Sequence, residues 1–420
     1  MRLALSRAVA GCLALLSAAG LSACGGGGNS SSTDGAGATG PAGKIVDIYS
    51  SLPMRGPTAA ESASIVNGIK LALAQSGGKA GPFKVQYTAL DDSAGSAGWD
   101  ASQTAANARK AAADPRAVYY IGEFDDGASE VSMPILNEAG IPQVSPANTY
   151  VGLTAAAPGN YWPTGTRTYL RIVPTDAVQA SGDLLAMHAA GCTKVAVASD
   201  DEPYGTGLAK LIDLQKGYYG IDVVNDTGID PSAHSFRTYA LMLKGLRADC
   251  LLIAGVASKG VVELTNEVHA ELPAAKFFGP AQMCTSAWTN AKGGGVPRVI
   301  DPLIQCTQVT QNVPAYPGGK SFLAAYTARY PGSNPGPYAI LGYEAMRLGL
   351  STIRLLGTNG DSKSAVLSEL FATTGRHSVL GTYSFNKVGD TTLKGIGLYK
   401  VGAAGNPTFD KTITTASCSG

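Results

Sequence analysis

Short runs rich in β-branched and aromatic residues alternate with helical patterns from residue 44 to residue 278 of this 420-residue chain. Such alternation is typical of βαβ units, which form a parallel sheet covered by helices on both faces. The strands expected from the pattern are 45–49, 83–90, 117–121, 141–144, 194–198, 222–225, 250–254 and 276–278. The helices expected between them are 59–75, 100–113, 128–139, 175–190, 205–217, 235–245 and 258–271. Because the same order of units occurs twice, we expect two doubly wound α/β lobes.

The last part of the chain predicts how the two lobes are joined. After residues 303–310 the pattern changes to helices alone, followed by two strands; these elements are expected at 319–330, 338–355, 363–373, 381–385 and 395–401. Three segments, 167–174, 303–311 and 377–386, are placed to cross between the lobes and form a three-segment hinge around a cleft. A body of this size is too large for one hydrophobic core. The predicted lobes are an N-lobe of residues 44–168 with 309–380, and a C-lobe of residues 169–308 with 381–420.

The N-terminus resembles a bacterial lipoprotein signal. Arg2 and Arg7 precede an apolar segment, residues 8–16, which is too short to cross a ~30 Å hydrocarbon core as a helix. The run Leu21-Ser22-Ala23-Cys24 follows this segment. The resemblance implies that residues 1–23 are removed as a signal peptide and that Cys24 carries acyl chains. The protein is then expected to be lipid-anchored at the outer face of the bacterial cytoplasmic membrane.

The segment that follows Cys24 fits a tether. Residues 24–43 consist mainly of Gly, Ser, Ala and Thr, so we expect a flexible linker with almost nothing to bury. The folded body is expected to begin near Lys44. The alternative to lipid anchoring is a soluble secreted protein cleaved after Ala19 or Ala23.

The charge balance argues against nucleic acid as a partner. The chain has 32 Lys and Arg against 31 Asp and Glu, a formal net charge of +1, and loss of Arg2 and Arg7 with the leader changes this to −1. A near-neutral body has no basic field with which to hold nucleic acid. Charged residues make up 15% of the chain, and 53 glycines favour compact α/β packing with tight turns over a coiled coil.

The cysteine pattern favours an oxidising compartment. Beyond the leader and Cys24, the cysteines are Cys192, Cys250, Cys284, Cys306 and Cys418, with no CxxC spacing and no adjacent His, so neither a metal nor another cofactor is expected. If the strands that follow Cys192 and begin at Cys250 are parallel neighbours, these two thiols can form a disulfide. Cys284 and Cys306 would then form a second, each stabilising the fold by about 3 to 4 kcal/mol. Free buried thiols are the alternative, and Cys418 has no assigned partner.

Several short segments occur in a characteristic order along the chain. They are GIKLALA at 68–74, DDS at 91–93, YIG at 120–122, PILNEAGIP at 134–142, VSPANT at 144–149, RIVPTD at 171–176 and YG at 204–205. In this order they resemble type 1 periplasmic binding proteins, specifically the leucine/isoleucine/valine-binding-protein-like substrate-binding lipoproteins of ABC transporters. The resemblance implies a monomer that captures a small molecule between two lobes, performs no chemistry on it and delivers it to an ABC permease.

The candidate ligand-binding residues follow the predicted strands. In α/β sheets, ligands settle beyond the carboxyl ends of strands, where loops and helix N-termini offer N–H groups. The candidates in the first lobe lie in the loops after strands 117–121 and 141–144, and those in the second lobe head helices 205–217 and 258–271. They are Asp125, Asp126, Gly127, Ser129, Ala147, Asn148, Thr149, Tyr204, Ser258 and Lys259.

The charges at these positions differ from those of similar receptors. There, a Ser and a Thr from the two first-lobe loops hold the carboxylate and amine of an amino acid. Thr149 matches, whereas Asp126 stands where the Ser is expected, unless a shift places Gly127 or Ser129 there. A carboxylate facing a bound carboxylate at ~4 Å costs several kcal/mol. We therefore expect Asp126 to meet a cationic group of the ligand.

The second departure is Lys259, which stands where relatives often carry a Glu for the ammonium group. If it contacts the ligand, it meets an anionic group; the alternative is a solvated helix residue. Asp125 and Asp126 have an alternative role as an N-cap pair for the following helix.

Aromatic and rim residues complete the predicted cleft. By resemblance, Tyr204 lies over the ligand, although a place on the lobe surface is the alternative. Trp99 is a candidate wall of the cleft or a residue packed within its own loop, and Met283-Cys284-Thr285 is placed to line the rim.

An enzyme has little support. The histidines His188, His234, His269 and His377 are scattered, and no GxSxG or HExxH motif occurs. The expected function is an extracytoplasmic solute-binding lipoprotein of an ABC importer, with a small polar ligand such as an amino acid, an amide or a related compound. The alternatives are a receptor that reports its ligand to a membrane sensor and a surface lipoprotein with an empty cleft.

Overall fold

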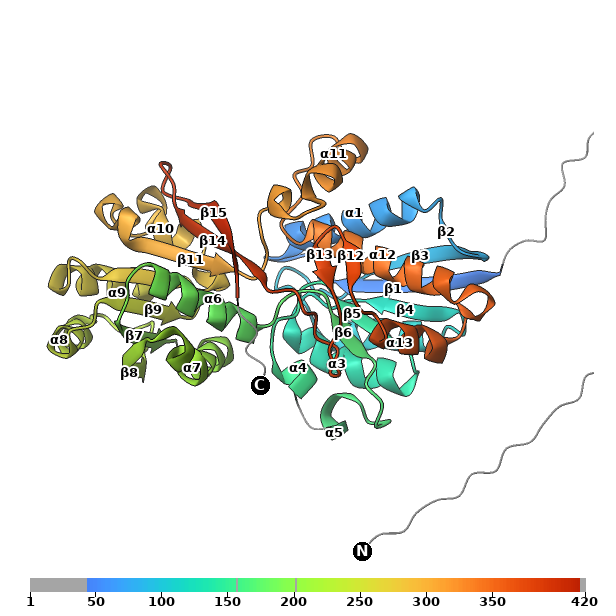
Figure 1. The fold of residues 1–420 in the computed structure, drawn as a ribbon, viewed down its shortest axis with the longest axis horizontal. Helices are drawn as coiled ribbons and strands as arrows, with labels where there is room; N and C mark the ends of the chain where they lie inside the picture. The colour runs from blue at the N-terminus through green and yellow to red at the C-terminus, as the bar shows by residue number, and fades with distance from the viewer. Residues whose placement is uncertain (1–43, 156–157, 201, 416–420) are drawn as a thin grey trace, which may run out of the picture. The chain divides into compact units, whose positions relative to one another are not determined.

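The computed structural model describes residues 44–155, 158–200 and 202–415, which form two large sheets and one two-stranded hairpin (Figure 1). The predicted signal peptide 1–23, linker 24–43, lipidated Cys24 and unpaired Cys418 lie outside these residues. Among the helices described, none combines the length and apolar character needed to cross a membrane.

The first sheet has the strand order β2-β3-β1-β4-β5-β6. Its strands are β1 (Ile45–Leu52), β2 (Lys79–Ala80), β3 (Phe83–Asp91), β4 (Ala117–Ile121), β5 (Gln143–Ser145) and β6 (Tyr169–Arg171). All pairings are parallel except that of β2 with β3. The carboxyl ends of five strands therefore share one edge, where the loops after β4 and β5 lie next to each other.

Helices cover both faces of this sheet because successive strand residues point to opposite sides. The helices of this lobe are α1 (Ala59–Gln75), α2 (Ala101–Ala112), α3 (Asp126–Glu138), α4 (Gly152–Ala155), α5 (Pro158–Tyr161), α11 (Gly319–Arg329), α12 (Ala339–Leu355) and α13 (Lys363–Phe371). Tyr119 of β4 packs in the core formed with α1 and α12, and its hydroxyl donates to the carbonyl of Ala345 at 2.9 Å. Tyr120, the next residue, packs with Ala108 of α2 and Leu136 of α3.

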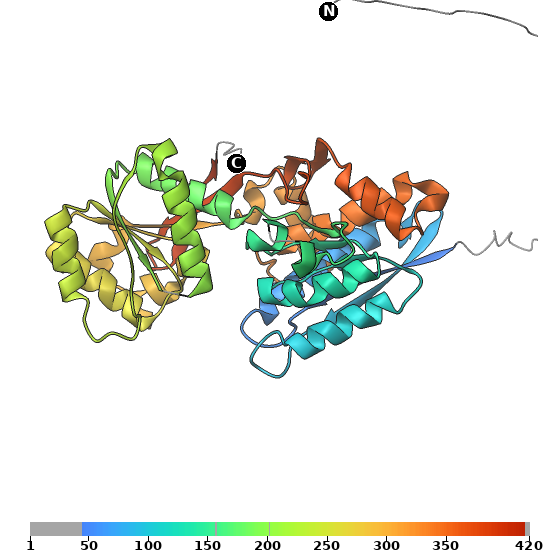
Figure 2. The ribbon, with the colours of Figure 1, turned by 90° about the horizontal axis from the view of Figure 1, so that it is seen from below.

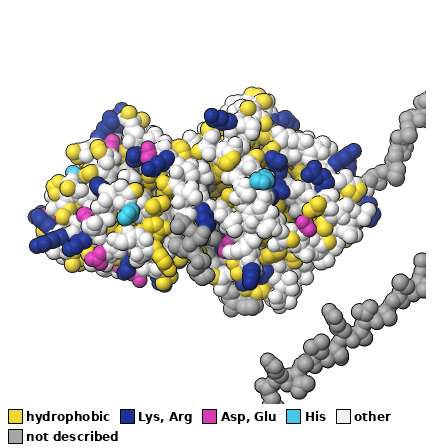
Figure 3. All heavy atoms as spheres, in the orientation of Figure 1, with side chains coloured by type: hydrophobic (Ala, Val, Ile, Leu, Met, Phe, Trp, Pro, Cys, Tyr) yellow, Lys and Arg dark blue, Asp and Glu magenta, His cyan; other side chains and the backbone are white. Residues whose placement is uncertain are grey.

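The second sheet has the order β15-β14-β11-β10-β9-β7-β8. Its strands are β7 (Lys194–Ser199), β8 (Asp222–Gly228), β9 (Cys250–Ala254), β10 (Lys276–Gly279), β11 (Ile304–Gln308), β14 (Gly395–Val401) and β15 (Pro407–Thr414). The helices beside it are α6 (Asp176–Ala189), α7 (Pro203–Gln215), α8 (Arg237–Leu246), α9 (Lys259–Glu271) and α10 (Ser286–Thr289). Figure 2 shows the strands between the green α6 and α7 and the yellow α8 and α9. On the face drawn in Figure 3, Lys and Arg side chains are spread over both lobes.

Two disulfides join parallel neighbours of this sheet. Cys250 of β9 pairs in register with Val195 of β7, which brings it beside Cys192 at the amino edge, and these two cysteines are bonded. Cys306 of β11 lies opposite Gly279 of β10 and is bonded to Cys284 in the loop that follows β10. The predicted pairings are confirmed, and the alternative of free thiols is wrong for these four cysteines.

The lobe boundaries differ from the prediction at two places. β6 pairs with β5, so residues 169–171 lie in the first sheet and not in the C-lobe. Phe385 packs in the first-lobe core, and the second sheet resumes only at β14, so residues 381–385 also lie in the first lobe. A three-residue strand such as β6 carries too little periodicity to be recognised in the sequence.

Two strands in the last part of the chain were missed, β12 (Arg376–Ser378) and β15, whereas β13 (Gly381–Tyr383) lies within the strand expected at 381–385. β15 alternates Thr, Phe and Lys over a half-exposed edge, and its antiparallel pairing with β14 gives the sheet an edge that the βαβ pattern did not predict. The hairpin of β12 (Arg376–Ser378) and β13 (Gly381–Tyr383) stands apart from both sheets.

Candidate ligand-binding cleft

The two loops at the carboxyl edge of the first sheet are held together by buried polar side chains. Ser129 Oγ donates to Asn148 Oδ1 at 2.5 Å, and Asn148 Nδ2 donates to the carbonyl of Phe124 at 3.0 Å. Tyr169 donates to the same Asn148 oxygen at 2.9 Å. Ser129 and Asn148 are fully buried. Both were predicted to contact the ligand, but their polar groups are used to join the loops.

The second of these loops has four consecutive backbone amides, and all four have acceptors within the protein. The amides of Ala147 and Asn148 donate to Ser145 Oγ at 3.1 and 2.9 Å. The amides of Thr149 and Tyr150 donate to Asp126 Oδ1 at 3.1 and 3.2 Å. The Asp126 carboxylate therefore binds the neighbouring loop.

Asp126 is the first residue of α3, and its environment opposes ionisation. Burial and the charge of Asp176 raise the pKa of the Asp126 carboxyl to about 7, against the lowering effect of the two amides and of Arg171. The neighbouring Asp125 occupies the N-cap position, but its side chain makes no capping hydrogen bond. The predicted N-cap pair is thus not formed. Burial and Asp92 raise the pKa of Asp125 to about 6.

Trp99 packs against Gly127. A Cβ atom added to Gly127 would lie 2.7 Å from Cζ2 of the Trp99 ring, so the glycine permits this close approach. Trp99 therefore packs on the start of α3, and Gly127 is enclosed beneath the indole.

Across the cleft, Tyr204 near the start of α7 belongs to a chain of hydrogen bonds. Its hydroxyl donates to Gln179 Oε1 at 3.2 Å, and Gln179 Nε2 donates to Thr307 Oγ1 at 3.2 Å. Thr307 Oγ1 in turn donates to the buried Asp183 Oδ1 at 2.7 Å. Burial, followed by the charges of Asp176 and Asp183, raises the pKa of Tyr204 well above its ordinary value.

The remaining second-lobe candidates occupy the start of α9. Ser258 is the N-cap, and its Oγ accepts from the Val261 amide at 3.3 Å. Lys259, the first residue of the helix, is exposed. Its exposure agrees with the alternative given for Lys259, a solvated helix residue, and not with contact to a ligand.

Asp200, which the sequence analysis missed, joins two loops of the second lobe as Asp126 does in the first. Its Oδ1 accepts from the Glu202 amide at 3.3 Å, and its Oδ2 accepts from the Val256 amide at 3.0 Å. Each lobe thus uses one aspartate to bind loops that follow neighbouring parallel strands.

Two further missed residues lie beside the first-lobe loops. Asp176, the first residue of α6, donates its amide to the Thr149 carbonyl at 2.9 Å, and its side chain is 7% exposed. Tyr338, just before α12, stacks edge-on against Phe124 with ring centroids 5.4 Å apart. Burial and the charges of Asp126, Glu61 and Asp176 raise the pKa of Tyr338. The motif RIVPTD contained Asp176, but sequence periodicity carries no signal that its side chain turns toward Thr149.

The buried cation beside these loops, Arg171, is already paired. Its side chain is 0% exposed, and Nε lies 2.6 Å from Asp390 Oδ1. Its other nitrogens donate to the Tyr150 carbonyl and to Thr154 Oγ1, each at 2.7 Å. Arg171 therefore fixes the end of the second loop against the segment that leads to β14.

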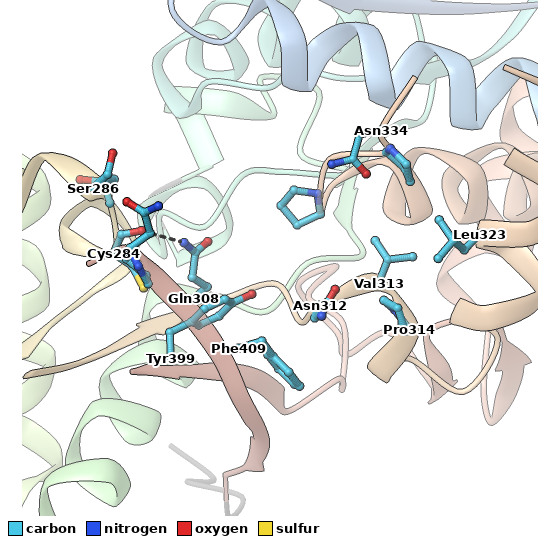
Figure 4. Close-up of a pocket in the computed structure, with 15 residues that line it drawn as sticks. Cys284, Ser286, Gln308, Asn312, Val313, Pro314, Leu323, Asn334, Tyr399 and Phe409 are labelled. Carbon is cyan, nitrogen blue, oxygen red and sulfur yellow. Dashed lines mark hydrogen bonds between the residues drawn. The ribbon is translucent and has the colours of Figure 1, made fainter. Parts of the chain in front are cut away.

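A cavity of about 630 Å³ lies between the end of the second sheet and the segments before α11 and α12 (Figure 4). Residues from the second-lobe side are Cys284, Thr285, Ser286, Gln308, Tyr399, Asn406, Pro407 and Phe409. Asn312, Val313, Pro314, Leu323, Asn334, Pro335 and Pro337 line the opposite side. Met283, Cys284 and Thr285 were expected at the rim; Cys284 and Thr285 line the cavity, whereas Met283 is fully buried in the core and does not. This wall is uncharged and combines amide, hydroxyl and aromatic groups, in contrast to the acidic loops around Asp126.

Two α/β lobes, each with loops gathered at the carboxyl edge of its sheet and joined by three chain crossings, define a two-lobed binding protein. The chain belongs to the periplasmic binding protein family, whose model matches residues 50–406.

Comparison with individual proteins gives the same result. The chain is 24% identical over 357 residues to a "Leu/Ile/Val-binding protein homolog 3" of Brucella melitensis, covering 83% of this chain and 89% of that protein. It is 21% identical over 319 residues to an "Amino acid binding protein" of Pseudomonas aeruginosa, covering 76% and 79%.

Solved structures share the fold. An ABC transporter substrate-binding protein from Desulfitobacterium hafniense in complex with Leu has a TM-score of 0.69 at 18% identity, covering 87% of this chain and 100% of that chain. A solute-binding protein from R. palustris in complex with benzoate has a TM-score of 0.65 at 18% identity, covering 89% and 97%. The relatives by sequence thus include Leu/Ile/Val-binding proteins, and the structural neighbours include substrate-binding proteins that hold leucine or benzoate.

Proposed function

We propose that this protein is the extracytoplasmic solute-binding lipoprotein of an ABC importer and performs no chemistry on its ligand. It captures a small polar solute between the lobes and presents it to a membrane permease. The observation that carries the proposal is the arrangement of loops at the carboxyl edges of both sheets, tied by Asp126 in one lobe and Asp200 in the other. A ligand held by both sets of loops favours the closed arrangement by its differential affinity for it.

A thermal-shift panel tests this function. Amino acids, their amides, short organic acids, aromatic acids and amines are added to the purified protein, and the melting temperature is measured. A ligand present at 100 times its Kd stabilises the folded state by about 2.7 kcal/mol. We expect one class of these solutes to raise the melting temperature in a concentration-dependent way. A flat response to every class would contradict solute binding.

The lipid anchor forms a separate part of the proposal. The run ending at Cys24 supports acylation of that cysteine and attachment to the outer face of the cytoplasmic membrane. Phase partitioning of the native protein and of a Cys24→Ala variant tests it. The native protein is expected in the detergent phase and the variant in the aqueous phase; equal partitioning would contradict acylation.

A further inference from the structure

The first-lobe loops have no backbone amide left for an anion along residues 147–150. Ser145 accepts from two of the four amides and Asp126 from the other two. A ligand carboxylate placed at Thr149 would have to displace the Asp126 carboxylate and face it across a few ångströms, which costs several kcal/mol at moderate effective dielectric. The loop is therefore closed to a ligand carboxylate.

The positive dipole ends of the two helices that begin in this region, α3 and α6, are also offset by acidic side chains. α3 begins at Asp126 and α6 begins at Asp176, so each positive helix end carries its own acidic side chain. A helix N-terminus attracts an anionic ligand through its free amides and its dipole. Here, both helix ends present a carboxyl group in place of a positive field.

Asp126 and Asp176 lie on either side of one residue, Thr149. Asp126 accepts from the Thr149 amide at 3.1 Å, and Asp176 donates its own amide to the Thr149 carbonyl at 2.9 Å. Asp176 is only 7% exposed. Its Oδ1 has no hydrogen-bond partner among the described residues. A buried carboxylate oxygen without a partner is costly unless a donor from a ligand or solvent meets it.

The cations near these acids are committed elsewhere. Arg171 is fully buried and binds Asp390, Thr154 and the Tyr150 carbonyl. Lys259, which was expected to bring positive charge to the opposite side, is exposed at the start of α9. Burial raises the pKa of both Asp126 and Asp176, and a cation bound between them would favour their ionised forms.

We propose that this position binds an organic cation, a protonated amine or a quaternary ammonium group, held between Asp126 and Asp176 at Thr149. The inference rests on the proposed solute-binding function and names its ligand class. Tyr204 and Tyr338 lie close enough for both acids to act on them, and aromatic rings attract ammonium groups. The negative charges of Asp126 and Asp176 both contribute to raising the pKa of Tyr204 and the pKa of Tyr338. The cavity of about 630 Å³, whose lining includes Pro337 next to Tyr338 in the chain, is uncharged and suits the uncharged part of such a ligand.

Matched ligands of one carbon skeleton test the inference by isothermal titration calorimetry. The probes are 3-methylbutylamine, 4-methylpentanoate, leucine and 3-methylbutanol, together with benzylamine and benzoate. The amines are expected to bind at least tenfold more tightly than the acids, the amino acid and the alcohol. Tighter binding of leucine or of either acid would overturn the inference and leave the proposed function in place. Absence of binding by these probes and by the whole thermal-shift panel would overturn both.

Two variants locate the amine. Asp126→Asn and Asp176→Asn remove charge while keeping an oxygen acceptor, and each is expected to weaken amine binding at least tenfold. Asp222→Asn removes the same charge from an exposed position at the opposite, amino edge of the second sheet and is the matched control, with an unchanged Kd. Circular dichroism and melting temperatures identify a variant that fails to fold, in which case the other variant decides. Equal amine affinity in a folded Asp126→Asn or Asp176→Asn protein and in wild type would contradict the assignment.

Discussion

Asp126 Oδ1 accepts the amide hydrogen of Thr149 at 3.1 Å, which ties the start of α3 to the loop that follows β5. The same oxygen accepts from Tyr150, so one carboxylate satisfies two amides of a loop that faces the second lobe. Asp126 thus joins two loops and is one of the two acids proposed to hold the ligand.

Replacing Asp126 by alanine is expected to lower stability by roughly 1 to 3 kcal/mol at pH 6, since two backbone amides lose their acceptor. Asp126→Asn is the control, because its side-chain carbonyl still accepts from both amides. Urea unfolding measures both variants. If alanine and asparagine destabilise the protein equally, the hydrogen bonds to Thr149 and Tyr150 contribute nothing.

Removing the Cys192–Cys250 disulfide with alanines at both positions is expected to cost about 4 kcal/mol on the chain-entropy account, because the bond closes a loop with a sequence separation of 58. Loss of the Cys284–Cys306 bond, with a separation of 22, is expected to cost about 3 kcal/mol. Denaturant unfolding of each double variant gives both values. An unchanged midpoint in the first variant would show that the bond does not constrain the unfolded chain.

Arg171→Met is expected to destabilise the protein by about 3 to 5 kcal/mol, because it leaves Asp390 and buried carbonyl oxygens without their cation. Arg109→Met, at an exposed position of α2, is the comparison and should change stability by less than about 0.5 kcal/mol. Equal unfolding free energies for the two variants would refute a structural role for the Arg171–Asp390 pair.

The buried Asp183 predicts a pH-dependent stability. Burial raises its pKa to about 7, while the hydrogen bond from Thr307 lowers it. The pKa of Asp183 is about 3.9 in the unfolded chain and higher in the native state. Its contribution to native-state stability is therefore fully present below about pH 3.9 and is lost as the pH rises toward 7. Asp183→Asn keeps an acceptor for Thr307 without the charge. The variant is expected to be more stable than wild type by roughly 1 to 3 kcal/mol at pH 8 and to lose most of this advantage by pH 5.

Guanidinium chloride unfolding at both pH values tests this sign. A variant that is less stable than wild type at pH 8 by the same amount as at pH 5 would show that the Asp183 carboxyl is not destabilised by its burial.

The sequence predicted those features that depend on long, regular patterns. The strand at residues 250–254 and the helix at 59–75 were predicted with the bounds that the structure has, because their apolar periodicity is unbroken. The disulfides followed from the parallel neighbours β7 and β9. β6 was assigned to the wrong lobe because a strand of three residues carries little pattern. β15 was missed because it is a half-exposed edge strand.

The site was harder to predict, because its side chains are satisfied by partners far away in the sequence. Ser129 and Asn148 have residue types suited to a ligand, yet they bind each other across 19 positions. Asp176 is separated from Asp126 by the whole of β5, β6 and the loops between them, so only the fold shows that both contact Thr149. Polar residue types at strand ends indicated where the loops gather, but not which of their atoms remain free.

Hydrogen–deuterium exchange with and without a stabilising solute tests the central claim, capture between the two lobes, most directly. We expect added protection in residues 122–129 and 147–150 of the first lobe, and simultaneously in residues 203–208 and 255–259 of the second. Protection confined to one lobe, or an unchanged exchange pattern at a saturating concentration of the solute, would contradict it.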